Sequence, residues 1–428
     1  MLRRRPFVPA RSRTSSAEAR QPARTRVAVR AGRLAAGLSR RLGLGEGAII
    51  GGRVTLLLDP GALSRLAAGR RVVLVSGTNG KTTVAHLLAG ALRNLGPVAH
   101  NDTGANMADG ALAALVARPE AQLAVLEVDE LHLPKIAGQV RPAVVVLLNL
   151  TRDQLDRSTE VGAVAAAMRR ALEAHPQATI IANADDPVIA TVADGLPRVQ
   201  WVAGGANWLG DAALCPRCGQ PLHREGGDWA CPSCGLHRSD PAWLLDDGVL
   251  HGPGSATPLV VQLPGDYNRR NAVMAVAAAA ALGVTPARAT AAVAEVRSVA
   301  HRYAVLQHGQ QRLTLLLAKN PAGWRETLPL LQEADGLLFV VNAREADGRD
   351  TSWLWDVPFE QPSGRPTVAS GEAAADLALR LAYADIAHDM VADPLQGLRL
   401  LPPGEVTVVA NYTAFTHLWH QLDRTGKP

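Results

Sequence analysis

The sequence predicts an α/β protein in which two domains are each built around a largely parallel sheet. Short β-branched runs alternate with Ala- and Leu-rich helical stretches in the first half of the chain, and a second strand and helix series begins near residue 299. Strands covered by helices on both faces favour parallel pairing. With 428 residues, of which 47% are apolar, the chain is long enough for two to three domains with ordinary cores.

The expected elements set the domain boundaries. The first series predicts strands at 72–76, 123–128, 143–148 and 179–181, with helices such as 83–95 and 161–174 between them. The second series predicts strands at 313–317, 336–341, 367–370 and 406–410. We expect a basic N-terminal arm at 1–45, a central domain at 46–298 and a C-terminal domain at 299–428. An insert at roughly 205–245 interrupts the central domain, with loops at 203–211 and 239–254 beside it.

A nucleotide phosphate cradle is predicted at the end of the first strand. Residues 71–83 read RVVLVSGTNGKTT, an apolar strand followed by a glycine-rich turn and the start of a helix. Backbone N–H groups of such a turn face phosphates, and the helix dipole favours their charge. The spacing is GxxGKT, with Val75 where a standard Walker loop has its first glycine, which favours a narrower nucleotide-binding class. The cradle residues are Gly77, Thr78, Asn79, Gly80, Lys81, Thr82 and Thr83.

Individual roles in the cradle follow from the side chains. The chain has only four lysines against 40 arginines, and one of the four is Lys81. A compact ammonium suits the β- and γ-phosphate oxygens, where a forked guanidinium would not. The hydroxyl of Thr82 is expected on Mg²⁺. Glu127 ends the neighbouring strand, where it would complete the Mg²⁺ site, although a solvated strand-end acid is the alternative.

All four cysteines lie in the insert. They form two CxxC knuckles, Cys215 with Cys218 and Cys231 with Cys234, each followed by glycine. Four thiolates at this spacing predict a zinc ribbon with a tetrahedral Zn²⁺ site. Two disulfides are the alternative, but a nucleotide cradle without a signal peptide indicates a reducing cytosol. With every cysteine committed to metal, no thiol remains for nucleophilic catalysis.

Positive charge is concentrated at the N-terminus. Residues 1–41 contain 12 arginines and one acid, Glu18, so that the rest of the chain is mildly acidic although the net charge is +5. The Ser, Pro and Ala content up to about residue 24 suggests disorder. A solvated arm, a membrane-surface role and a transit peptide stay open. The longest apolar run, 272–282, is half a membrane span, so we expect a cytoplasmic protein, with a peripheral place at the inner face of the cytoplasmic membrane left open.

Further motifs follow the cradle and Glu127. They are NLTRDQLDR at 149–157, NADDP at 183–187 and GDYNRRN at 265–271. In order and spacing the set resembles the Mur ligase family over roughly residues 45–428. The resemblance implies a central ATP-binding domain, a Rossmann-like C-terminal domain, and ATP and Mg²⁺ as cofactors. It also implies that Asn183, Asp186, Asn268 and Asn271 hold the adenosine part, although Asp185 or Asp186 before Pro187 could instead be a helix N-cap.

A narrower resemblance is to the MurT-type subunit of lipid II isoglutaminyl synthase. The cysteine insert carries it, together with EVDE at 127–130, RDQLDR at 152–157, KNPAG at 319–323 and ADGRDTSW at 346–353. It implies ATP-dependent amidation of the D-glutamate α-carboxylate in the lipid II stem peptide to D-isoglutamine, with ammonia from a GatD-type glutaminase partner. Amide formation needs an activated carboxylate, and γ-phosphoryl transfer gives an acyl phosphate that ammonia can attack.

Two residues near the domain junction are candidates for the second half of the site. Lys319 follows the expected strand 313–317 at its carboxyl end, so we expect it to meet the acyl phosphate when the domains close. A surface lysine is the alternative. Arg302, in the sequence His301-Arg302, stands where the family has a glycine and arginine pattern, so its arginine is expected at the substrate or the hinge.

The glutaminase nucleophile must lie on another polypeptide, because amidotransferases of this kind use a Cys activated by His and this chain has no uncommitted Cys. The segment 346–356 is the expected partner interface, since Trp353 and Trp355 are the large anchors typical of binding hot spots. Alternatively, these tryptophans cap the domain core. The resemblance implies that Asp350 orients the partner's catalytic His, with Asp356 as the second choice.

Two other functions fit the sequence less well. An autonomous Mur or folylpolyglutamate-type amino-acid ligase would carry a carbamylated lysine, yet residues 158–182 contain no Lys. Such ligases also have a metal-binding histidine where this chain has Gln154. A nucleic-acid-binding zinc-ribbon ATPase is suggested by the arm and the ribbon. However, the ribbon segment is roughly charge-balanced and the body is acidic, so nucleic acid is not an expected partner.

Overall fold

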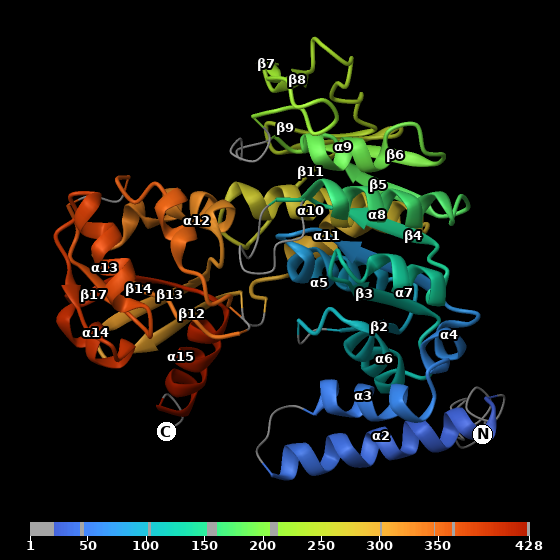
Figure 1. Ribbon diagram of the computed structural model, residues 1–428, viewed down its shortest axis with the longest axis horizontal. Coiled ribbons are helices and arrows are strands. Elements are labelled where there is room, and N and C mark those ends of the chain that lie inside the picture. Colours follow the sequence, from blue (N-terminus) through green and yellow to red (C-terminus); the bar gives the residue numbers. More distant parts are fainter. Residues whose placement is uncertain are drawn as a thin grey trace, which may run out of the picture.

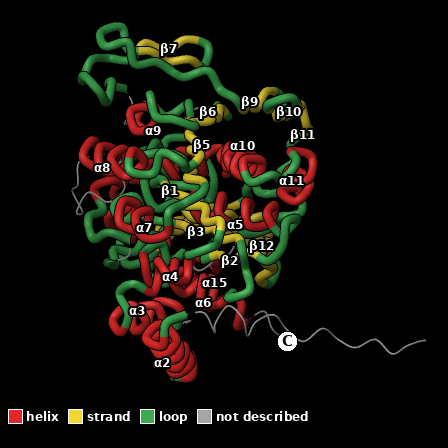
Figure 2. Tube along the Cα trace, turned by 90° about the vertical axis from the view of Figure 1, so that its right-hand side faces the viewer, coloured by secondary structure: helices red, strands yellow, loops and turns green. Residues whose placement is uncertain are grey.

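The computed structural model describes residues 21–42, 47–101, 104–151, 161–205, 213–299, 302–345, 347–361 and 364–425. Two α/β units lie side by side, each with its own sheet (Figure 1). The larger unit carries the cysteine insert at one end and a pair of N-terminal helices at the other, and the same order is seen after a quarter turn (Figure 2).

The central sheet has nine strands in the order β11-β10-β9-β6-β5-β4-β1-β3-β2. β1 lies between β3 and β4, and every residue of β1 after Arg71 is buried, as expected of a central parallel strand. Pairing is parallel from β2 through β9, and β10 is antiparallel to both of its neighbours. The strands are β1 (Arg71–Ser76), β2 (Val98–His100), β3 (Leu123–Glu127), β4 (Val144–Leu147), β5 (Thr179–Asn183), β6 (Val199–Ala203), β9 (Trp243–Asp246), β10 (Val249–Gly252) and β11 (Ser255–Pro258).

Helices cover both faces of this sheet, because its strands are apolar on both sides. Val72 and Leu74 of β1 face one core, whereas Val73 and Val75 face the other. The first face is covered by α4 (Ala62–Ala67), α6 (Ala108–Ala117), α7 (Leu133–Val140), α8 (Val161–Glu173) and α9 (Pro187–Ala193). The second is covered by α5 (Lys81–Leu92), α10 (Asp266–Ala281) and α11 (Pro286–Ala294).

The cysteine insert leaves the sheet after β6 and returns at β9. Its own strands are the two-stranded pair β7 (His223–Glu225) and β8 (Asp228–Ala230). The expected loop at 239–254 was wrong, since β9 and β10 form a hairpin there. The turn between them has Asp247 at φ 42° and Gly248 at φ 75°, and an Asp-Gly pair between short apolar runs is the signal that was missed. Most of the other expected loop, 203–211, lies outside the described residues.

The C-terminal sheet has six strands in the order β12-β13-β17-β14-β15-β16, and only the pair β12 and β13 is antiparallel. The strands are β12 (Tyr303–His308), β13 (Gln311–Leu317), β14 (Gly336–Val340), β15 (Thr367–Ser370), β16 (Asp389–Met390) and β17 (Gly404–Ala410). One face packs on α12 (Pro321–Thr327), η2 (Leu328–Glu333), η3 (Ser352–Asp356) and α13 (Ala374–Tyr383). The other packs on α14 (Pro394–Leu400) and α15 (Tyr412–Thr425).

Two N-terminal helices, α2 (Ala23–Arg41) and α3 (Ala48–Leu58), form a hairpin packed on α6. Part of the segment expected to be a basic arm is thus helical, while residues 1–20 lie outside the described residues. Small residues allow the two helices to cross closely, since a Cβ on Gly32 would lie 2.1 Å from the Thr55 hydroxyl. Among the described residues, none of the helices has both the length and the hydropathy needed to cross a membrane.

Candidate active site

A pocket of about 430 Å³ lies between the two domains. Its central-domain wall is made by the loops that follow β1, β3, β4 and β5, together with the start of α10. Because these strands are parallel, their carboxyl ends meet at one edge, where open α/β sheets bind ligands. The C-terminal domain supplies the opposite wall from Arg302, Tyr303, the segment 317–327 and Tyr412.

The predicted phosphate cradle is built at this edge. Gly80 has φ 87° and lies directly before α5, so its backbone suits glycine and directs the first helical N–H groups at the pocket. A Cβ at Gly80 would lie 2.5 Å from the Asn271 side-chain oxygen. A side chain at this position would therefore have to displace the Asn271 amide of α10.

Lys81 is folded back over its own loop. Its Nζ donates to the carbonyls of Gly77 and Thr78 and lies 2.9 Å from Oε2 of Glu130. The Lys81 side chain is 7% exposed and that of Glu130 12%, so the ion pair is largely shielded from water. Glu130 was quoted within the EVDE motif but not identified as a site residue. The signal was its place three residues beyond Glu127, on the loop that leaves β3.

Glu127 and Thr82 meet as the sequence predicted. Thr82 Oγ1 donates to Glu127 Oε2 at 2.8 Å, and Arg302 Nη2 reaches the same hydroxyl at 2.8 Å from the C-terminal domain. Glu127 is 1% exposed, and its other oxygen, Oε1, has no hydrogen-bond partner among the described residues. A solvated strand-end acid is therefore not what the structure shows. A buried carboxylate oxygen beside a threonine hydroxyl suits a hard cation such as Mg²⁺.

Two asparagines hold this edge rigid, and neither was identified as a site residue from the sequence. Asn101 accepts from the Glu127 N–H at 2.8 Å and donates to its carbonyl at 3.0 Å. Asn149 does the same for Asn79, at 2.9 and 3.0 Å. These reciprocal bonds use only the backbone of Asn79 and Glu127, so they fix the loop after β1 and the end of β3. Beyond Thr151, the motif at 152–157 with Gln154 lies outside the described residues.

The NADDP segment forms a loop and a helix cap. Asp186 Oδ1 accepts from Val188 N and Ile189 N, which makes it the N-cap of α9, and Oδ2 accepts from Leu150 N at 3.0 Å. The helix-cap alternative is thus the arrangement observed for Asp186. Asn183 lines the pocket and donates to the Leu148 carbonyl at 2.8 Å. A role for both in holding the adenosine part stays a proposal.

Asn268 and Asn271 lie on the first turns of α10, within the pocket wall. Nearby, Tyr267 is half-buried, and desolvation together with the negative charge of Glu326 raises the pKa of Tyr267 to about 12, so its phenol stays protonated at neutral pH. Arg270 pairs with Glu326 of the C-terminal domain. The α10 start therefore contributes both to the pocket and to the contact between the domains.

Lys319 lines the pocket directly after β13, as predicted from its position at a strand end. The next residue, Asn320, is fully buried and caps α12 by accepting from Gly323 N. Its amide also exchanges two hydrogen bonds with the Asn79 amide, at 3.2 and 3.3 Å. The C-terminal domain thus rests directly on the phosphate cradle, with Lys319 beside it.

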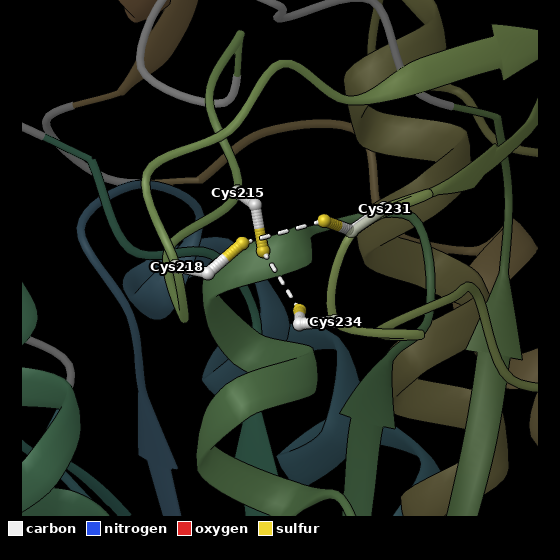
Figure 3. Close-up of side chains that lie close together, drawn as sticks. All are labelled: Cys215, Cys218, Cys231 and Cys234. Atoms are coloured by element: carbon white, nitrogen blue, oxygen red, sulfur yellow. Dashed lines mark hydrogen bonds between the residues drawn. The ribbon is translucent and has the colours of Figure 1, made fainter.

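The four cysteines converge, as Figure 3 shows. Their sulfur atoms all lie within 4.8 Å of one another, and the closest approaches are 3.4 Å between Cys218 and Cys231 and 3.6 Å between Cys215 and Cys234. All four are free thiols, so the two-disulfide alternative is not what is observed. Four sulfurs converging in this way suit one tetrahedral metal.

The insert is fastened to the NADDP segment. Trp229 Nε1 donates to the Ala184 carbonyl at 3.1 Å, and Arg238 Nε donates to Asp185 Oδ1 at 2.8 Å. The Arg238 and Asp185 side chains are 15% and 3% exposed. These buried contacts fix the loop that begins with Asn183, and Asp185 of this loop also lines the pocket. A change in the fold of the insert would therefore alter the position of the NADDP loop at the pocket.

The segment with Asp350 leads into η3, which packs on the same face of the C-terminal sheet as α12 and α13. Trp353 is buried in that core, as the alternative interpretation held, whereas Trp355 is 50% exposed. Asp350 is exposed and accepts from Ser352 N at 2.8 Å, and the hydrogen bonds from Ser352 lower the pKa of Asp350 below its usual value. It is therefore an accessible carboxylate. Asp347 anchors the segment by accepting from Thr413 N, and burial raises the pKa of Asp347.

Comparisons with known proteins agree with this geometry. Residues 75–202 match the family model of the Mur ligase middle domain, and residues 317–415 match that of the MurT ligase C-terminal domain. Among solved structures, the pseudomurein peptide ligase type C from Methanothermus fervidus has a TM-score of 0.67 at 16% identity, covering 85% of this chain and 80% of that one. MurF from Acinetobacter baumannii has a TM-score of 0.66 at 18% identity, covering 87% and 80%. These two likenesses concern the fold.

Two relatives are more similar to this chain in sequence than these solved structures are. The chain is 32% identical to a protein of Streptococcus pneumoniae named lipid II isoglutaminyl synthase (glutamine-hydrolyzing) subunit MurT, over 74% of this chain and 77% of the relative. It is 26% identical to the protein of the same name from Staphylococcus aureus, over 93% of this chain and 98% of the relative. The α/β fold, the two matched domains and these relatives lead to one assignment: the chain belongs to the Mur ligase family, in its MurT branch.

Proposed function

We propose that this protein is the synthetase subunit of a glutamine-dependent amidotransferase that converts the D-glutamate α-carboxylate of lipid II to D-isoglutamine during peptidoglycan synthesis. One observation carries the proposal. The phosphate cradle, with Glu127 and Thr82, faces Lys319 across the pocket between the domains. The names of the two MurT relatives supply the substrate and the amide donor.

The reaction divides into activation and amide formation. The substrate carboxylate attacks the γ-phosphorus of ATP, so that a carboxyl C–O–P linkage forms and ADP leaves. Ammonia then attacks the acyl carbon, the bond from that carbon to the phosphate oxygen breaks, and the nitrogen loses a proton. Neither step needs an oxidant. The protein has to orient ATP, the substrate carboxylate and ammonia. It also has to balance the negative charge of the phosphoryl group as it moves from ATP to the carboxylate.

Five of the residues that line the pocket have a role in that scheme. Thr82 and Glu127 would hold Mg²⁺, which supplies charge neutralisation at the phosphates when bound. Lys81 leaves Glu130 to contact the β- and γ-phosphates, and the cradle N–H groups donate hydrogen bonds to the phosphate oxygens. Lys319, which belongs to the C-terminal domain, contacts the phosphoryl group during its transfer. Arg302 donates to the Thr82 hydroxyl and so holds the C-terminal domain in place against the cradle.

A GatD-type glutaminase is the proposed source of ammonia. This chain cannot supply the Cys nucleophile if its four cysteines hold a zinc ion, which is the metal we propose for the cluster. Asp350 is an exposed carboxylate, and Trp355 of the same segment is 50% exposed, so a partner can reach both. We propose that Asp350 orients the partner's catalytic His. Because lipid II is anchored in a membrane, we place the complex at the inner face of the cytoplasmic membrane.

We expect Lys81→Ala to abolish ATP-dependent amidation of lipid II by the purified chain supplied with ammonium. Lys81 is the only lysine in the cradle, so the variant has no ammonium group there. The Glu130 carboxylate also loses its ion-pair partner. Mass spectrometry of lipid II distinguishes the carboxyl from the amide. The matched control is Lys135→Ala, because Lys135 is exposed on α7. Substantial amide product from the Lys81 variant would contradict the assignment of the cradle.

Asp350→Asn is expected to lower glutamine-dependent amidation strongly while ammonium-dependent amidation persists. An asparagine cannot fix the tautomer of an imidazole as a carboxylate does. The measurement compares the two ammonia sources in the reconstituted complex, with Asp356→Asn as the matched variant in the same segment. Equal loss of both activities in the Asp350 variant would place Asp350 in the synthetase site. Loss in neither would leave the segment without a role in glutamine hydrolysis.

Reduced, freshly purified protein should contain about one Zn²⁺ per chain, and Cys218→Ser should lose it. Because Trp229 and Arg238 connect the insert to the NADDP segment, the same variant should also bind ATP more weakly. Elemental analysis and titration calorimetry measure the two effects. His237→Ala is the control, since His237 is exposed and lies outside the cysteine cluster. Wild-type protein without zinc would overturn the metal assignment.

A further inference from the structure

The N-terminal hairpin of α2 and α3 has an inverted distribution of side chains. Its buried positions hold mostly small residues, namely Thr25, Ala28, Val29, Gly32 and Ser39 in α2 and Gly51, Gly52 and Thr55 in α3. Most of its large aliphatic residues are exposed, although Val29 is buried and Leu56 packs against the core. A helix that covers a protein core has the opposite arrangement, with its large apolar residues inside.

The outward residues are numerous and strongly exposed. Eight of the 20 exposed large hydrophobic residues of the described chain lie in this hairpin, which are Val27, Leu34, Leu38, Leu42, Ile49, Ile50, Leu57 and Leu58. Leu34 and Leu57 are 76% and 81% exposed. On α2, Val27, Leu34 and Leu38 recur at intervals of seven and four residues, so they share one face. Grouped apolar residues of this kind mark an interaction surface.

The same hairpin is strongly basic. Seven exposed arginines border the apolar residues: Arg24, Arg26, Arg30, Arg33, Arg40, Arg41 and Arg53. Within the described residues from 21 to 60 there is one acid, Asp59, which is buried and hydrogen-bonded to Thr25 and Arg65. Six more arginines precede the hairpin in residues 1–20. The surface therefore combines aliphatic side chains with a net positive charge.

The hairpin is firmly attached to the body, so its outer face cannot simply fold inward. Arg53 pairs with Asp109 of α6 at 3.0 Å, and Arg33 Nη2 donates to the Val116 carbonyl at 3.1 Å. A Cβ on Gly52 would lie 2.2 Å from the Asp109 carbonyl oxygen. The inner face is thus closely packed on α6, and α2 is the outermost element at the end of the molecule opposite the cysteine insert (Figures 1 and 2).

We propose that this hairpin binds the surface of an anionic lipid bilayer, with its leucines and isoleucines among the upper acyl chains and its arginines at the phosphate headgroups. Charge decides between lipid and a second copy of the chain. A twofold interface would bring the arginines of two hairpins together, whereas anionic lipid neutralises them. An apolar face flanked by arginines is typical of helices that lie in the membrane interface. The inference does not rest on the proposed amidation.

Vesicle flotation with the full-length protein tests the proposal. We expect binding to phosphatidylcholine vesicles that contain phosphatidylglycerol, little binding to pure phosphatidylcholine, and release as salt is raised. The variant Leu34→Ser/Leu38→Ser/Leu57→Ser should bind the anionic vesicles at least about tenfold more weakly. Its matched control is Leu95→Ser/Leu131→Ser/Leu400→Ser, three leucines exposed elsewhere on the molecule, which should bind as the wild type does.

A second variant keeps the test valid if the leucine changes disturb folding. Arg26→Gln/Arg30→Gln/Arg41→Gln alters only exposed charges and should also lose binding to anionic vesicles. Wild-type protein that ignores anionic vesicles would overturn the proposal. So would leucine and arginine variants that bind within about twofold of the wild type. A dimer in analytical ultracentrifugation that the leucine variant dissociates, without vesicle binding by the wild type, would assign the surface to a second copy.

Discussion

The meeting of Glu127 and Thr82 at the edge of the central sheet is the contact on which the rest of the site depends. It exists because β1 and β3 are parallel neighbours, with Val75 opposite Glu127, so that the loops after both strands open on the same side. Desolvating a carboxylate at this position is costly unless a cation is bound. The reciprocal bonds of Asn101 hold the Glu127 backbone so that the unpartnered oxygen remains available.

The C-terminal domain contacts the central domain at this same edge of the central sheet. Arg302 reaches the Thr82 hydroxyl, and Asn320 pairs with Asn79 of the cradle, so the second domain contacts the residues that would bind phosphate and metal. Lys319 directly precedes Asn320, so it lies beside this contact and lines the pocket. The arrangement explains why activation of a carboxylate would require both domains, and why a buried asparagine, Asn320, lies between them.

Much of this architecture could be predicted, because its signals are local. The β-branched run at 71–76, the glycine turn and the lysine predict a strand, a cradle and a helix together, and parallel topology then places Glu127 beside Thr82. Glu130, Asn101, Asn149 and Asn320 were not identified, since their roles depend on partners far along the chain. The N-terminal hairpin was missed because its helices bury small residues, and a pattern of outward leucines does not resemble a core-facing helix.

Titration of a non-hydrolysable ATP analogue with and without Mg²⁺ tests the central claim most directly. If Glu127 and Thr82 hold the metal, Mg²⁺ should strengthen nucleotide binding in the wild type, and Glu127→Gln should remove most of that effect. Glu130→Gln should keep it, because Glu130 pairs with Lys81 instead. A Glu127 variant with the same dependence on Mg²⁺ as the wild type would contradict the account.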